Sequence, residues 1–199
     1  MANYWVVMVS YLIGSIPVSY LVARYWKGVD IRRVGSGNVG ATNVWRSAGP
    51  LAGITALAGD VAKGLLAVVL ARHFGDSLLV AVSALAVLAG HGWPVFLGFK
   101  GGKLVATGAG VIAAISPPVL AAAFAVWLAV VFASRYISAG SIAAAVSIPV
   151  LMFIFHLDWP YLAVGFLTAL FSSYKHIPNI KRLANGTEPK VNLKINIWR

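Results

Sequence analysis

The segment with the clearest chemical potential is the polar, glycine-rich stretch at residues 35–46, which reads GSGNVGATNVWR. Its three glycines allow the backbone to turn so that consecutive N–H groups converge on one concave surface, and such a surface binds anions. Hydroxyl and amide side chains add donors, and the terminal arginine adds a planar fork that suits phosphate oxygens. We therefore expect a phosphate-binding loop, with contacts from Gly35, Ser36, Gly37, Asn38, Gly40, Thr42, Asn43 and Arg46.

A second polar segment, residues 90–107, reads GHGWPVFLGFKGGKLVAT. It combines His91 and Lys103 with a flexible Gly101–Gly102 pair. The lysine is a suitable phosphate partner, although basic residues at the ends of membrane spans often only anchor the chain to lipid headgroups. His91 stands before a Trp93–Pro94 kink, where it serves either as a substrate contact or as a hydrogen-bonding group between helices; both interpretations stay open.

The third polar segment, residues 174–188, reads YKHIPNIKRLANGTE. Its proline is placed to start a short helix that Asn185–Gly186 would end. Such a helix presents His176 and Asn179 near its positive end, where an anion is favoured. In the fourth segment, RYISAGS at residues 135–141, Ser141 is either a site residue or an ordinary helix cap.

The sequence lacks the residues that several other kinds of catalytic site require. A two-metal phosphotransferase site needs several converging carboxylates, and the chain has five Asp and Glu in all and no Cys. No G-x-S-x-G nucleophile motif occurs, and no His is followed five residues later by Asp. Residues 35–40 match G-x-G-x-x-G, but no strand precedes them and an apolar span follows, which argues against dinucleotide binding. We expect neither a metal nor a cofactor.

Composition indicates what must position these groups. Of the 199 residues, 60% are hydrophobic and 11% charged, and the mean hydropathy is +0.84; soluble domains are far more polar. We expect an all-α integral membrane protein, one domain over residues 1–199, with a short interfacial helix and basic tail at 174–199. Seven apolar segments are expected, at residues 4–23, 51–71, 77–97, 104–115, 119–133, 140–155 and 161–173. Ser-Pro-Pro at 116–118 makes segment 104–115 only half a span long, and a five-span arrangement stays open.

The net charge of +11 comes from basic residues that cluster between the apolar segments. This pattern is typical of charges that orient a membrane protein and does not indicate nucleic acid binding. With the N-terminus outside, 14 of the 16 Lys and Arg fall in cytoplasmic loops or the tail. The positive-inside rule therefore predicts N-out and C-in, which places every polar motif on the cytoplasmic face. Residues 4–23 lack the basic start and cleavage pattern of a signal peptide, so we expect a retained span.

Two opposite charges lie inside a predicted span. Asp60 and Lys63 are three residues apart, so they share one helix face and either neutralise each other or face a polar cavity. Structural and catalytic roles are both open for this pair.

Four motifs together carry a resemblance: GSGNVGATN followed by Arg46, GH…P.F..FKGGK..AT, D..KG at Asp60–Lys63, and H..NI.RL..G.E. In type and order they resemble the bacterial acyl-phosphate:glycerol-3-phosphate acyltransferase (PlsY) family, over nearly the whole chain. The resemblance implies a seven-helix enzyme of the bacterial inner membrane that moves a fatty acyl group from acyl phosphate to the 1-hydroxyl of glycerol 3-phosphate. The products are lysophosphatidic acid and phosphate, in the first acylation step of phospholipid synthesis. The resemblance also implies substrate-assisted catalysis, in which the donor's own phosphate accepts the proton.

We expect catalytic roles for Ser36, Arg46, Lys103, His176 and Asn179, and substrate contacts from the rest of residues 35–43 named above and from His91, Gly101, Gly102, Ser141 and Glu188. The expected partners are acyl phosphate, glycerol 3-phosphate and the lipid bilayer, with functional coupling to the enzyme that makes acyl phosphate. The family usually has glycine after the motif lysine, and this chain has Leu104. The competing hypotheses are a small transporter or channel for phosphate-bearing anions and a non-catalytic scaffold that binds acidic lipid.

Overall fold

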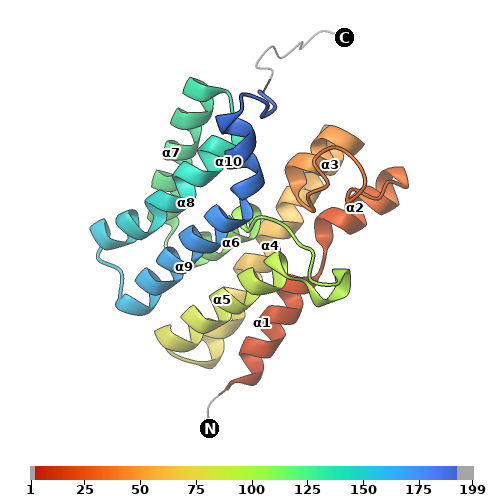
Figure 1. Ribbon diagram of the computed structural model, residues 1–199. Coiled ribbons are helices and arrows are strands. Elements are labelled where there is room, and N and C mark those ends of the chain that lie inside the picture. The colour runs from red at the N-terminus through yellow and green to blue at the C-terminus, as the bar shows by residue number, and fades with distance from the viewer. Residues whose placement is uncertain (1–2, 192–199) are drawn as a thin grey trace.

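The computed structural model describes residues 3–191, and every regular element in that range is a helix (Figure 1). The elements are α1 (Trp5–Ser15), α2 (Val18–Lys27), α3 (Ala41–Ala48), α4 (Pro50–Phe74), α5 (Ser77–Gly92), the 3-10 helix η1 (Val95–Leu97), α6 (Val105–Ile115), α7 (Pro117–Ser134), α8 (Ile137–Ile154), α9 (Trp159–Lys175) and α10 (Ile177–Ala184). Five segments are long and apolar enough to cross a membrane, one of them α1 and α2 taken together. The predicted all-helical membrane fold is confirmed; the count of seven spans and the N-out orientation stay predictions.

Prolines interrupt two of the predicted spans. Segment 4–23 was expected to be one helix, but α1 ends at Ser15 and α2 begins at Val18. Pro17 causes this break, because proline has no N–H and disfavours helical geometry at the preceding residue. In the same way α5 ends at Gly92, before Trp93–Pro94, so the predicted span 77–97 is helical only to that point and continues as η1.

The half-length segment expected at residues 104–115 is α6, which has 11 residues. At 1.5 Å per residue it is about 16 Å long, roughly half the hydrocarbon thickness of a bilayer. Pro117 and Pro118 then occupy the first turn of α7, where a missing N–H costs nothing. The glycine-rich motif differs from its prediction, since it is loop only as far as Gly40 and helical from Ala41 onward as α3.

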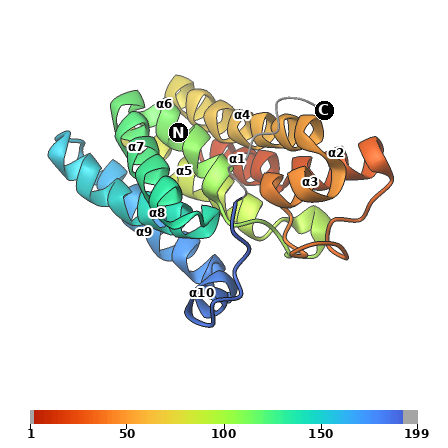
Figure 2. The same cartoon turned by 90° about the horizontal axis from the view of Figure 1, so that it is seen from above.

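The helices form a bundle in which α5 and α6 lie between two groups, α7–α9 on one side and α1–α4 on the other (Figure 2). Glycines permit the closest contacts. A Cβ on Gly64 of α4 would overlap the carbonyl oxygen of Thr107 on α6, and one on Gly110 of α6 would overlap that of Val61 on α4. Small residues at such crossings let membrane helices pack backbone to backbone.

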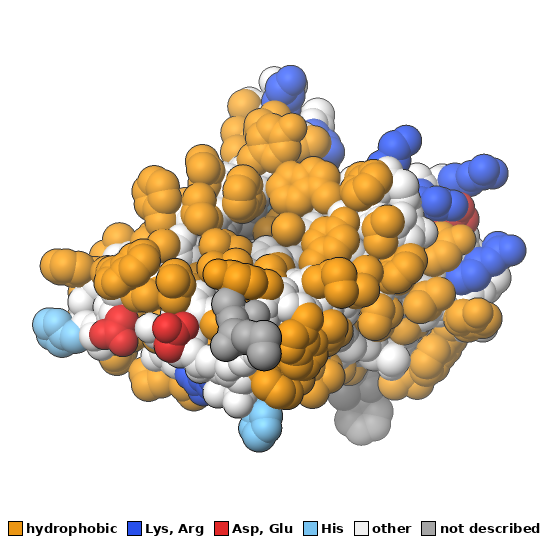
Figure 3. All heavy atoms as spheres, turned by 90° about the horizontal axis from the view of Figure 1, so that it is seen from below, with side chains coloured by type: hydrophobic (Ala, Val, Ile, Leu, Met, Phe, Trp, Pro, Cys, Tyr) orange, Lys and Arg blue, Asp and Glu red, His pale blue; other side chains and the backbone are white. Residues whose placement is uncertain are grey.

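The outer surface of the bundle is apolar. In Figure 3, hydrophobic side chains cover most of the visible face, and most of the visible Lys and Arg gather toward one margin of it. Large exposed hydrophobic residues occur along the helices, among them Leu57, Leu66, Phe132 and Phe153. Water would not favour such a surface, whereas lipid does.

Candidate active site

Two motifs that are far apart in the sequence meet at Lys103. This residue lies in the loop before α6, and its Nζ donates a hydrogen bond to Oδ1 of Asn179 in the first turn of α10. Nδ2 of Asn179 donates to Oε1 of Glu188 at 2.6 Å, and Nε of Arg182 donates to Oε2 of the same carboxylate at 2.7 Å. The resulting cluster is Lys103, Asn179, Arg182 and Glu188.

The short helix predicted at 178–184 is present and explains this placement. His176 is both the C-cap of α9 and the N-cap of α10, and Pro178 lies in the first turn of α10. Gly186 has φ +68°, the left-handed conformation that ends helices, and the chain then turns back so that Glu188 faces α10. Asn179 thus lies in the first turn of α10, at the end where the helix dipole is positive.

The cluster carries more positive than negative charge. Burial and, to a smaller extent, the charges of Arg182 and Arg46 lower the pKa of Lys103 to about 8, although Glu188 opposes them. Burial alone would raise the pKa of Glu188, but the side chains of Ser138, Asn179 and Arg182 outweigh this and hold it below its usual value. Lys103 and Arg182 therefore share one ionised carboxylate, Arg46 is near enough to act on Lys103, and an anionic substrate would restore the balance.

His176 is buried beside this cluster. Its Nδ1 lies 2.8 Å from the carbonyl oxygen of Ser172, which can only accept, so Nδ1 carries the proton. Burial and, to a smaller extent, the charge of Lys103 lower the pKa of His176 to about 4, so the ring is neutral near pH 7. Nε2 of this tautomer is left as a hydrogen-bond acceptor.

Asn43 organises the glycine-rich loop from within. Its side-chain oxygen accepts from the backbone N–H of Ser36 at 3.1 Å, and its Nδ2 donates to the carbonyls of Ile31, Val34 and Asn38 at 2.9–3.1 Å. Gly35 and Gly37 have φ +59° and +68°, the left-handed region that favours glycine. In the structure Asn43 is a buried residue that shapes the loop; direct contact of its amide with substrate stays a prediction.

The remaining predicted residues of this motif lie on its outside. Ser36 and Gly37 are exposed, Asn38 and Gly40 are half-buried, and Thr42 and Arg46 are exposed on α3. The Ser36 hydroxyl accepts from the backbone N–H of Asn38 at 3.4 Å. These groups are accessible to a ligand that approaches the loop.

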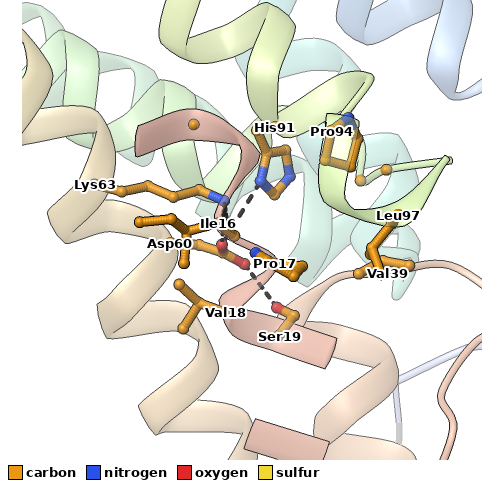
Figure 4. Close-up of a pocket in the computed structure, with 13 residues that line it drawn as sticks. Ile16, Pro17, Val18, Ser19, Val39, Asp60, Lys63, His91, Pro94 and Leu97 are labelled. Carbon is orange, nitrogen blue, oxygen red and sulfur yellow. Dashed lines mark hydrogen bonds and ion pairs between the residues drawn. The ribbon is translucent and has the colours of Figure 1, made fainter. Parts of the chain in front are cut away.

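A second buried polar cluster lies between α1, α2, α4 and α5 (Figure 4). Asp60 and Lys63 of α4 form the predicted ion pair, with Nζ 2.9 Å from Oδ1. His91 Nδ1 lies 3.6 Å from the same oxygen, and Ser19 Oγ donates to Oδ2 at 2.6 Å. This cluster lines a cavity of about 10 Å³ that also touches Gly101 and Gly102.

Ser141 bonds to its own helix and to the neighbouring α7. Its Oγ donates to the carbonyl of Ile137, one turn earlier in α8, at 2.9 Å and accepts from Trp127 Nε1 at 3.4 Å. Two residues with clear structural roles were missed in the sequence. Arg182 stands in the motif NI.RL and could have been paired with Glu188, whereas Ser19 carries no sequence signal beyond its nearness to Pro17.

Comparisons with known proteins identify this arrangement. The family model described as glycerol-3-phosphate acyltransferase matches residues 4–186. The chain belongs to this family. A glycerol-3-phosphate acyltransferase of Desulforamulus reducens is 50% identical over 95% of both chains, and a Moorella thermoacetica protein called glycerol-3-phosphate acyltransferase 2 is 52% identical over 92% of this chain and 95% of its own.

Two solved structures of a glycerol-3-phosphate acyltransferase are also similar. Both are crystal structures of PlsY, an integral membrane enzyme, in a glycerol 3-phosphate form and a lysophosphatidic acid form. The first has a TM-score of 0.91 and 40% identity, the second 0.89 and 39%, and each match covers 94% of both chains. The resemblance drawn from the four motifs is therefore confirmed, and so is the membrane-enzyme fold.

Proposed function

We propose that this glycerol-3-phosphate acyltransferase takes its acyl group directly from an acyl phosphate. The 1-hydroxyl oxygen of glycerol 3-phosphate attacks the acyl carbon and forms the new ester bond. The bond between that carbon and the donor's phosphate oxygen breaks, and phosphate leaves with the hydroxyl proton. The products are 1-acyl-glycerol 3-phosphate and inorganic phosphate.

The observation that carries this proposal is the surplus of cations around Glu188. Both substrates bear a phosphate, and Arg182 and Arg46 are close enough to Lys103 to lower its pKa. The glycine-rich motif that carries Arg46 adds the exposed hydroxyls of Ser36 and Thr42. Binding the two anions side by side replaces a bimolecular encounter with an intramolecular one, and this can contribute about 7–11 kcal/mol to lowering a barrier. The same cations stabilise charge that develops on the leaving phosphate.

Proton transfer is assigned to the donor phosphate, which is itself a base near neutral pH. The neutral His176 ring supports this scheme as a positioning acceptor, because its Nε2 can orient a substrate hydroxyl without a change of charge. Among residues 3–191, no group of three His, Asp, Glu or Cys lies together as a metal site would require. Metal-independent transfer is part of the proposal and is tested below.

We also propose the bacterial cytoplasmic membrane as the location, with the active face toward the cytoplasm. The clustering of Lys and Arg in the loops that carry the motifs supports this assignment. An acyl-phosphate-producing enzyme on the same face would supply the donor, which makes functional coupling with that enzyme part of the proposal. Residues 192–199 of the expected basic tail lie outside the described residues.

The direct test uses purified protein in detergent, radiolabelled glycerol 3-phosphate and EDTA. We expect lysophosphatidic acid from palmitoyl phosphate and none from palmitoyl-coenzyme A. Product only from the thioester, or activity that EDTA removes and added Mg²⁺ restores, would contradict the proposal. Heat-denatured protein is the control for uncatalysed acyl transfer.

A second measurement tests whether transfer is direct. Ser36 is the exposed hydroxyl of the phosphate loop and the best candidate for a covalent intermediate. Intact-mass spectrometry after mixing enzyme with palmitoyl phosphate alone should show no acyl adduct. A stoichiometric adduct that Ser36→Ala removes would show a two-step mechanism through serine.

A further inference from the structure

The buried cluster at Asp60 continues to the loop that carries Lys103. Asp60 is 1% exposed and receives three groups: Ser19 from α2, Lys63 from its own helix and His91 from α5. Lys63 also donates from Nζ to the carbonyl of Ile16 at 2.9 Å, an oxygen that the break at Pro17 leaves without a helical partner. The cluster thus fixes the broken first span and the end of α5 relative to α4.

The Gly101–Gly102 turn packs directly on His91. The N–H of Gly102 donates to the main-chain oxygen of His91 at 3.1 Å. A Cβ on Gly101 would overlap that same oxygen, and a Cβ on Gly102 would overlap Nε2 of the His91 ring and approach the carbonyl oxygen of Val39 to 2.8 Å. Both glycines of the turn therefore pack against His91, and Lys103 is the next residue.

We propose that His91 is a positioning residue for acyl transfer: Asp60 fixes its ring, the ring and carbonyl of His91 fix the Gly101–Gly102 turn, and the turn aims Lys103 at the substrate phosphate. This inference rests on the function proposed above. The chain of contacts joins α2, α4, α5 and the Lys103 loop, and Figure 4 shows its buried part.

The geometry argues against the role of substrate contact that the sequence suggested for His91. The residue is 6% exposed, its Nδ1 faces Asp60, and its Nε2 faces Gly102. The adjoining cavity, at about 10 Å³, has room for about one water molecule and none for glycerol 3-phosphate. Helix packing alone is also a poor explanation, because apolar residues would hold these helices together without the desolvation cost of buried charges.

The test compares His91→Phe, which keeps a planar ring and removes both nitrogens, with His73→Phe, a control at an exposed histidine in the last turn of α4. Thermal unfolding in detergent identifies folded variants. We expect His91→Phe to lose roughly 10- to 100-fold in kcat/KM for glycerol 3-phosphate, the scale of one charge-assisted contact. Its alkaline pH limb should also move upward from about 8, because a displaced Lys103 becomes more solvated. His73→Phe should match the wild type.

A second variant covers the case in which His91→Phe does not fold. In His91→Asn, the amide nitrogen keeps a donor near Asp60 and the main-chain oxygen is unchanged, but the side chain is too short to reach Gly102, so the same two changes are expected. Wild-type kinetics in a folded variant, or a loss of activity with the alkaline limb unmoved, would overturn the proposal, as would failure of both variants to fold. A wild-type enzyme unable to use acyl phosphate would instead refute the proposed function, whatever the His91 variants do.

Discussion

Lys103 donates a hydrogen bond to the side chain of Asn179, a residue 76 positions further along the chain. The bond joins the loop between α5 and α6 to the start of α10. Asn179 in turn donates to Glu188, so the position of the lysine depends on a network that closes only when the C-terminal motif is folded against the bundle. Loss of Asn179 should therefore impair the enzyme through Lys103.

Removal of the phosphate-binding cations should lower catalytic efficiency strongly. Arg46→Ala and Lys103→Ala each delete a charge-assisted contact, worth about 1.5–3 kcal/mol, and should reduce kcat/KM roughly 10- to 100-fold. Arg33→Ala is the matched control, since Arg33 has a side chain 85% exposed in the adjacent loop. Steady-state kinetics on purified protein decides the comparison, and equal losses in all three would indicate a general charge effect.

Activity should fall in alkaline solution as Lys103 loses its proton. Its pKa of about 8 means that the free enzyme carries the charge below pH 8 and loses it above, so kcat/KM should decline through that range. Lys103→Arg keeps its charge at every accessible pH, and its alkaline limb should disappear or move above pH 10 even if its absolute activity is low. A limb that stays near pH 8 in this variant would assign it to another group.

Membrane orientation can be measured because the chain has no cysteine. Single cysteines at Gly37, Gly102 and Thr187 should resist an impermeant maleimide in intact cells and react after permeabilisation. A cysteine at Asn3 should react from outside in both conditions. Labelling of Gly37→Cys in intact cells would reverse the proposed orientation.

Leu104 occupies a conformation that suits glycine, with φ +69°, and its side chain is 1% exposed in the main apolar core. The left-handed backbone costs roughly 1–2 kcal/mol, and deletion of a buried leucine side chain costs about 2–5 kcal/mol. Leu104→Gly loses the packing of the side chain but relieves the backbone strain, whereas Leu104→Ala loses the packing and keeps the strain. Thermal unfolding in detergent should rank wild type above Leu104→Gly and Leu104→Gly above Leu104→Ala. If alanine proves the more stable replacement, backbone strain at this position is negligible.

Much of the fold could be predicted because bilayer thickness and hydropathy restrict it strongly. The apolar segments, the Ser116–Pro117 break and the short helix at Pro178 all follow from local rules. The break at Pro17 was missed because the segment as a whole is apolar enough to span, and hydropathy alone does not register a proline. The helical state of residues 41–48 was hidden by the glycines and polar residues that dominate the first half of the same motif.

Several residues of the candidate site could be predicted from the sequence, but their contact partners could not. Lys103, His176 and Asn179 were expected from motif context, and the structure brings them together. The buried role of Asn43, the bond of His91 to Gly102 and the bond of Ser141 to Trp127 join residues that no local sequence rule pairs. The spacing between Asp60 and Lys63 predicted their pairing, while the participation of Ser19 and His91 required the packing of two other helices, α2 and α5.

The three-residue spacing of Asp60 and Lys63 also affects how the protein reaches the membrane. A single ionised side chain at the centre of a span adds about 2.5–3.5 kcal/mol to the cost of insertion. Because both charges lie on one face of α4, with Nζ 2.9 Å from Oδ1, the segment can form its own neutral pair as it leaves the translocation machinery. Insertion of α4 therefore does not have to wait for α5, which is synthesised later and brings His91 to the pair.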